Sequence, residues 1–184
     1  MTRAERRVAI AQDVLQQLKD LSLIPGMRGW LKIKAGRLHP SQKQQLQNVL
    51  LAGDPTTPCS ACALGACFVA AVRLGNECLV DPRGTYLFED DLGRVDHREA
   101  TNMQTLLRGH FSRRQLMLIE GCFEGGFGYY KDYQMEEVLG AEQMTRWEQW
   151  VGRTYNARLP HGLAHHRMEL IMQNIVQNKG TFRV

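Results

Sequence analysis

The chain has 184 residues, of which 43 % are hydrophobic and 23 % are charged, and its formal net charge is +4. This length suits one domain that folds without disulfides, and the composition excludes a collagen-like, low-complexity or largely disordered protein. The longest apolar run, residues 61–74, contains an arginine and falls short of the roughly 20 residues of a membrane span. With no signal-peptide pattern and an odd number of cysteines (five), we expect reduced thiols, a cytoplasmic protein and no membrane partner.

Charge is segregated along the chain. Residues 1–43 hold nine basic and three acidic residues, and residues 146–184 hold six and two, whereas residues 44–145 hold eight and fourteen. Basic ends around an acidic middle can steer a polyanion towards the protein, or can let distant segments attract one another. The second explanation is favoured here, because no run of consecutive basic residues exceeds two.

Helix signals dominate the first part of the chain. Thr2 and Glu5 have the spacing of a capping box, and the apolar residues that follow recur at helical intervals, which predicts a helix over residues 3–20. Pro25-Gly26 is typical of a turn. Residues 29–33 alternate between apolar and polar side chains, as a short strand does.

Capping residues and periodicity predict further helices downstream, and a turn sequence predicts one hairpin. The predicted helices cover residues 41–53, 59–75, 97–108, 113–124, 136–154 and 161–178, and the hairpin strands cover 78–80 and 85–88. The sequence therefore predicts a mainly α fold. We expect a single compact domain, residues 1–184, of about seven helices around the central apolar helix 59–75, with a small β-hairpin.

Two cysteines lie at the N-terminal end of the predicted helix 59–75, the most apolar of these helices. Cys59 and Cys62 are three residues apart, which places both on one helical face, and a helix N-terminus lowers the pKa of a thiol. Two thiolates can supply half of a tetrahedral zinc site, but no second Cys-x-x-Cys or His-x-x-x-His pair supplies the other half. Core packing is the favoured role, so no cofactor is expected, and a zinc site or a thiolate-dependent enzyme at these two residues is an alternative.

A basic stretch precedes the helix predicted at residues 113–124. Two arginines at a helix N-terminus, with basic neighbours just before it, can clamp a phosphate together with the free backbone amides. Two tyrosines after the helix can stack on bases. A solvated helix face is the alternative explanation. The predicted phosphate or nucleic-acid site consists of Arg108, His110, Arg113, Arg114, Tyr129 and Tyr130.

Two segments carry a resemblance to a known group of proteins. Residues 59–66, Cys-Ser-Ala-Cys-Ala-Leu-Gly-Ala, and residues 167–182, which contain Ile-Met-Gln-Asn-Ile-Val-Gln-Asn-Lys-Gly-Thr-Phe, resemble small uncharacterised proteins of tailed phages and bacterial genomes. Residues 7–15 and 111–120 resemble the same pattern. The resemblance implies a shared fold and origin, and it transfers no catalytic residue.

The sequence contains no paired carboxylates, Ser-x-x-Lys, phosphate-cradling glycine loop or His-Glu-x-x-His motif. We therefore expect a non-enzymatic binding protein. The resemblance implies a phage-derived accessory or anti-defence factor that acts on a host protein or complex. The alternatives are a nucleic-acid or nucleotide-phosphate binder that uses residues 108–114, and a zinc or thiolate enzyme at Cys59 and Cys62.

Overall fold

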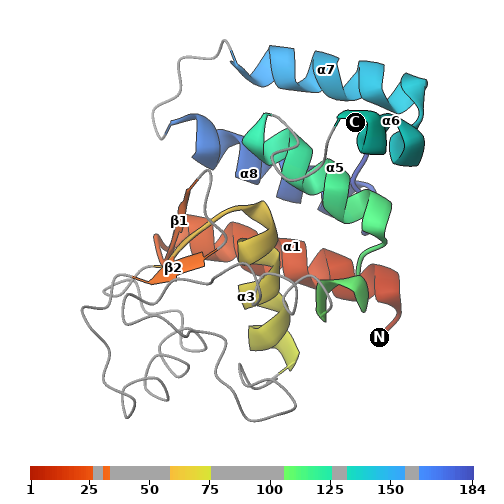
Figure 1. Ribbon diagram of the computed structural model, residues 1–184. Coiled ribbons are helices and arrows are strands. Elements are labelled where there is room, and N and C mark those ends of the chain that lie inside the picture. Colours follow the sequence, from red (N-terminus) through yellow and green to blue (C-terminus); the bar gives the residue numbers. More distant parts are fainter. Residues whose placement is uncertain (27–30, 34–58, 76–105, 126–131, 156–161) are drawn as a thin grey trace.

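The computed structural model describes residues 1–26, 31–33, 59–75, 106–125, 132–155 and 162–184 (Figure 1). These residues form α1 (Arg3–Lys19), β1 (Leu23–Pro25), β2 (Leu31–Ile33), β3 (Cys59–Ala61), α3 (Ala63–Gly75), α5 (Arg113–Glu124), α6 (Asp132–Leu139), α7 (Ala141–Tyr155) and α8 (Leu163–Gln177). The predicted mainly α fold is confirmed, because these helices and the helical residues 106–108 agree with the expected number of about seven. Within these ranges no helix is both long enough and apolar enough to cross a bilayer.

The helix starts follow the capping signals. The amide of Glu5 donates to Thr2 Oγ1 at 3.2 Å and the amide of Thr2 donates to Glu5 Oε2 at 2.7 Å, which is the predicted capping box of α1. Ser112 Oγ accepts from the Gln115 amide at 3.2 Å and caps α5. Helix α5 ends at Gly125, whose φ of 72° is the left-handed conformation that closes many helices.

The helices lie in layers (Figure 1). Helix α7 forms the top layer in this view, α5 and α8 lie beneath it, and α1 lies at the bottom with α3 crossing it. Helix α1 packs against α8 and α3, and α5 packs against α8, α3 and α7. The chain therefore folds with its first and last helices in direct contact.

A three-stranded sheet lies at one end of α1. Strand β3 is central, with β1 parallel to it in the register Leu23↔Cys59 and β2 antiparallel to it in the register Leu31↔Ala61. The strand predicted at 29–33 is confirmed at Leu31–Ile33, whereas β1 and β3 were not predicted. The predicted helix 41–53, the hairpin strands 78–80 and 85–88, and most of the helix 97–108 lie outside the described residues.

Helix α3 is the predicted central apolar helix. All of its residues from Ala63 to Val72 are buried, because small side chains let neighbouring helices approach from every side. It begins at Ala63, four residues later than predicted, because Cys59–Ala61 pair with β1 and β2 instead. The prediction that Cys59 and Cys62 share a helical face is therefore wrong.

Candidate functional site

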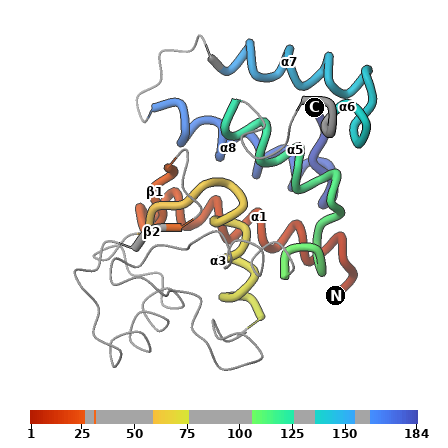
Figure 2. Tube along the Cα trace, viewed as in Figure 1, coloured from red at the N-terminus to blue at the C-terminus, as the bar shows by residue number. Residues whose placement is uncertain are grey.

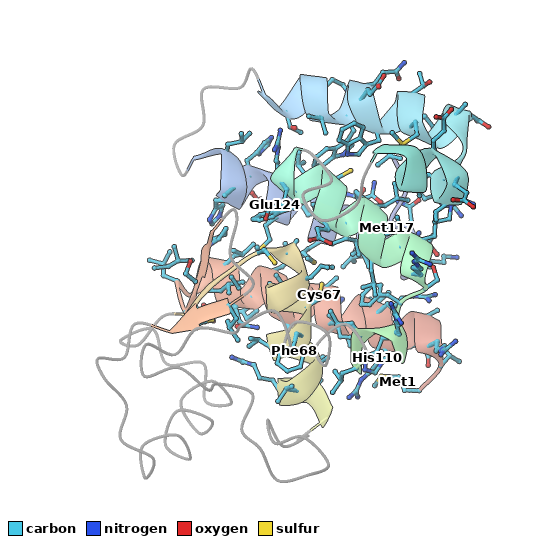
Figure 3. The ribbon with its side chains drawn as sticks, in the orientation of Figure 1. Met1, Cys67, Phe68, His110, Met117 and Glu124 are labelled. Carbon is cyan, nitrogen blue, oxygen red and sulfur yellow. The ribbon has the colours of Figure 1, made fainter. Side chains whose placement is uncertain are left out.

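The start of α1 lies against the turn that precedes α5. Arg3 Nε donates to the carbonyl of Gly109 at 3.0 Å, and Arg7 Nη1 donates to the carbonyl of His110 at 3.2 Å. Figure 2 shows these two segments side by side, and Figure 3 places Met1 and His110 at the same corner of the molecule. Basic residues more than a hundred positions apart in the sequence are thereby brought onto one surface.

The C-terminal segment reaches the same region. Gly180 packs so closely on α1 that a Cβ added to it would lie 2.5 Å from the Ala4 carbonyl oxygen. Phe182 is hydrogen-bonded through its backbone to the side chain of Gln115, in the first turn of α5. Two exposed basic residues, Lys179 and Arg183, stand next to these contacts in the sequence. We call the whole set the cationic corner: Arg3, Arg6, Arg7, Arg108, Arg113, Lys179 and Arg183.

The three arginines of α1 point in similar directions. At 100° per residue, Arg3, Arg6 and Arg7 fall within about 100° of arc, and Glu5 lies on the opposite side of the helix. The carboxylate of Glu5 accepts from the Thr2 backbone amide, which lowers the pKa of Glu5. Carboxylates pair with Arg73 and Arg146 elsewhere, and no carboxylate in the described ranges pairs with an arginine of the cationic corner.

Two arginines of the cationic corner have fixed hydrogen-bond partners. Arg3 and Arg7 are each held by a hydrogen bond to a backbone carbonyl, and the Nε atoms of Arg6 and Arg7 are buried without an acceptor in the part of the chain that the structure describes. Helices α1 and α5 both begin here, so the positive ends of two helix dipoles add to the side-chain charge. The arrangement is suited to oxyanions that accept several hydrogen bonds at once.

The predicted phosphate-binding residues divide into three groups. Arg108 and Arg113 are exposed in the cationic corner, and the backbone carbonyl of half-buried His110 holds Arg7 in place. Tyr129 and Tyr130 lie outside the described residues.

Arg114 is bonded away from the other predicted residues. Its Nη2 donates to the carbonyl of Leu139 at 3.1 Å and its Nε donates to Gln143 Oε1 at 3.2 Å, so it joins α5 to α6 and α7 and does not face the corner.

Sequence reasoning missed the basic residues of α1 and of the C-terminal segment as members of the site. The excess of basic residues at both ends of the chain was the signal that pointed to them. Which ends meet, and which of their side chains share a surface, depends on tertiary contacts such as the bond from Arg3 to Gly109.

The cysteines have a different environment from the one a thiolate site requires. Cys59 is 3 % exposed and Cys62 is 4 % exposed, and burial raises the pKa of Cys59 to about 11 and that of Cys62 to about 12. The Gly65 amide donates to Cys62 Sγ at 3.4 Å, but this contact at the start of α3 is outweighed by burial. The described His, Cys, Asp and Glu residues include no group of three placed to hold a metal ion. Zinc binding at these two thiols stays an untested prediction.

Three members of the cationic corner, Arg7, Arg113 and Lys179, lie in the segments that resemble phage proteins. Those segments include the buried start of α3 and most of α8, and the phage origin they suggest stays a prediction. Comparisons of the chain with protein-family models, with curated proteins and with solved structures each returned no match.

Proposed function

We propose that the protein is a non-enzymatic binding protein whose cationic corner holds the phosphate backbone of a nucleic acid. One observation carries this proposal: the bonds from Arg3 and Arg7 to the carbonyls of residues 109 and 110 unite the basic start of α1 with the basic residues ahead of α5. A nucleic acid is favoured over a host protein as the partner, because the cationic corner is rich in arginine and no described carboxylate pairs with its arginines.

Arginine suits this partner for physical reasons. Its planar guanidinium group presents several donors in a fixed fork, is weakly hydrated and stays charged at all working pH values. Side chains that are already held by backbone carbonyls lose less conformational freedom on binding, which leaves more of the interaction energy as affinity. Neutralising several phosphates releases condensed counterions, so binding by this surface should weaken steeply with salt.

The test measures the affinity for fluorescent single-stranded and duplex oligonucleotides between about 50 and about 200 mM salt. We expect a linear fall of log K with log salt concentration. The double variant Arg108→Gln/Arg113→Gln should bind more weakly, and its salt slope should be lower by about one unit for each phosphate that it no longer neutralises. Both side chains are exposed, so the variant should keep the fold.

A matched control removes the same charge elsewhere. Arg146→Gln/Arg153→Gln changes two exposed arginines of α7, in the top layer of the molecule and away from the start of α1 (Figure 1). Binding that weakens equally in both double variants would show that only net charge matters, and the proposed site would be wrong. Binding to polyglutamate but to no oligonucleotide would identify an acidic protein as the partner class and would also contradict the proposal.

A further inference from the structure

A glutamate lies inside the helical core, independently of the cationic corner. Glu120 is in the middle of α5 and is 8 % exposed, with buried residues on both sides of it in the sequence. Its Oε2 atom is inaccessible to solvent and has no hydrogen-bond partner among the residues that the structure describes. An ionised carboxylate in this position is costly, because a buried charge needs a counter-charge or several donors.

The groups around Glu120 add to this cost. Glu124 follows one helical turn later on the same face of α5, and the buried Cys62 thiol at the start of α3 is close enough for the charges of both carboxylates to act on it. Figure 3 shows Glu124 towards the end of α5, with α3 and its Cys67 beneath that helix. Burial, and secondly the charge of Glu124, raises the pKa of Glu120 to about 7.

The other helices packed on α5 bring no described counter-ion that lowers this pKa. The buried cation of α8, Arg167, donates to the Phe123 carbonyl and to Thr154 Oγ1, both at 3.1 Å. The remaining titratable or charged residues of α6, α7 and α8 whose side chains the structure describes are exposed or half-buried: Glu136, Glu137, Glu142, Arg146, Glu148, Arg153, His165, His166 and Glu169.

We propose that Glu120 is a proton-operated latch, which keeps α5 closed on the start of α3 while it is protonated and lets this interface open when it ionises. In the closed state the carboxyl group is neutral, and its burial costs less free energy than burial of the ionised group would. Ionisation favours any state in which water reaches the carboxylate, and the interface with α3 is where Glu120 approaches Cys62. The folded state holds its proton more tightly than an open state does, so opening becomes more favourable as the pH rises from about 4.5 to about 7 and then levels off.

The test is hydrogen exchange on the full chain at several pH values between 5 and 8, analysed as protection factors so that the intrinsic pH dependence is removed. In the wild type, we expect protection of the amides of Gly65, Ala66 and residues 119–123 to fall about tenfold per pH unit up to pH 7. Glu120→Gln should keep these protection factors constant. Glu136→Gln, an exposed glutamate of α6, should behave as the wild type does.

Two results would overturn the latch. Protection that falls to the same extent in Glu120→Gln would show that another group titrates. Protection that falls equally at Val14 and Ile171, in the cores of α1 and α8, would show that ionisation lowers only the global stability. Should Glu120→Gln fail to fold, Glu124→Gln provides the second variant: it removes the neighbouring charge, so the fall in protection should level off at a lower pH, and an unchanged pH window would contradict the proposal.

Discussion

The side-chain amide of Gln115 forms two hydrogen bonds with the backbone of Phe182. Gln115 Nε2 donates to the Phe182 carbonyl at 3.0 Å, and the Phe182 amide donates to Gln115 Oε1 at 2.7 Å. The two residues are 67 positions apart, and Phe182 is buried with its ring edge-on to Trp150 at a centroid distance of 6.2 Å. One glutamine in the first turn of α5 thus holds the C-terminal segment on the core.

Gln115→Ala should lower the free energy of unfolding by about 2 kcal/mol, because it removes two hydrogen bonds and leaves the backbone of Phe182 without these partners. Urea denaturation measures the change. Gln16→Ala is the control, since exposed Gln16 bonds only to the exposed Asp20 side chain, and it should cost less than about 0.5 kcal/mol. Equal costs for both variants would contradict the role given to Gln115.

Arg167 joins three helices from a buried position. Its bonds to the Phe123 carbonyl and Thr154 Oγ1 link α8 to the ends of α5 and α7. Arg167→Met should cost about 3 kcal/mol, because it leaves two buried acceptors unpaired. A double-mutant cycle with Thr154→Val should give a coupling energy of about 1 kcal/mol, and additive costs would show that the bond to Thr154 contributes nothing.

Gly180 combines an unusual backbone conformation with a close contact. Its φ is 87°, and an added Cβ would meet the Ala4 carbonyl oxygen at 2.5 Å. Gly180→Ala should therefore destabilise the protein by about 2 kcal/mol or more, measured as a lower midpoint of thermal unfolding. Gly140→Ala separates the two causes, because Gly140 has a φ of 79° and nothing within 4 Å of its added Cβ, so its cost should be about 1 kcal/mol.

Cys59 should react slowly in the folded protein. Burial in strand β3 raises its pKa to about 11, so little thiolate exists at pH 8. We expect alkylation by iodoacetamide to be at least about a hundredfold slower in the native chain than in urea, measured by mass spectrometry of the Cys59 peptide. Rapid alkylation of Cys59 in the folded chain would contradict this prediction and would support the hypothesis of a thiolate enzyme.

Local signals in the sequence were enough to place the starts of α1 and α5. The capping bonds Thr2–Glu5 and Ser112–Gln115 each join residues three positions apart. Both partners therefore appear within one short stretch of sequence. Strands β1 and β3 could not be predicted in the same way. The residues of β3 read as the first turn of the predicted helix 59–75, and the pairing of Leu23 with Cys59 is formed by segments far apart in the chain.

The candidate site also depends on contacts between distant segments, which the sequence alone does not predict. The sequence shows the basic residues ahead of α5. Tertiary contacts determine that Arg114 bonds to the Leu139 carbonyl and that Arg3 and Arg7 lie beside residues 109 and 110. For Glu120 the sequence predicts only that it lies in the helix 113–124. Its burial follows from the packing of α3 and α8 on α5, which no spacing within α5 reveals.

The contact between α1 and α8 has a consequence for synthesis of the chain. Helix α1 is made well before α8, and part of the apolar surface of α1 packs against α8 in the folded protein. That part of α1 stays uncovered until α8 has been synthesised. An uncovered apolar surface attracts chaperones and favours aggregation, so the contact between α1 and α8 forms late in the folding of a nascent chain.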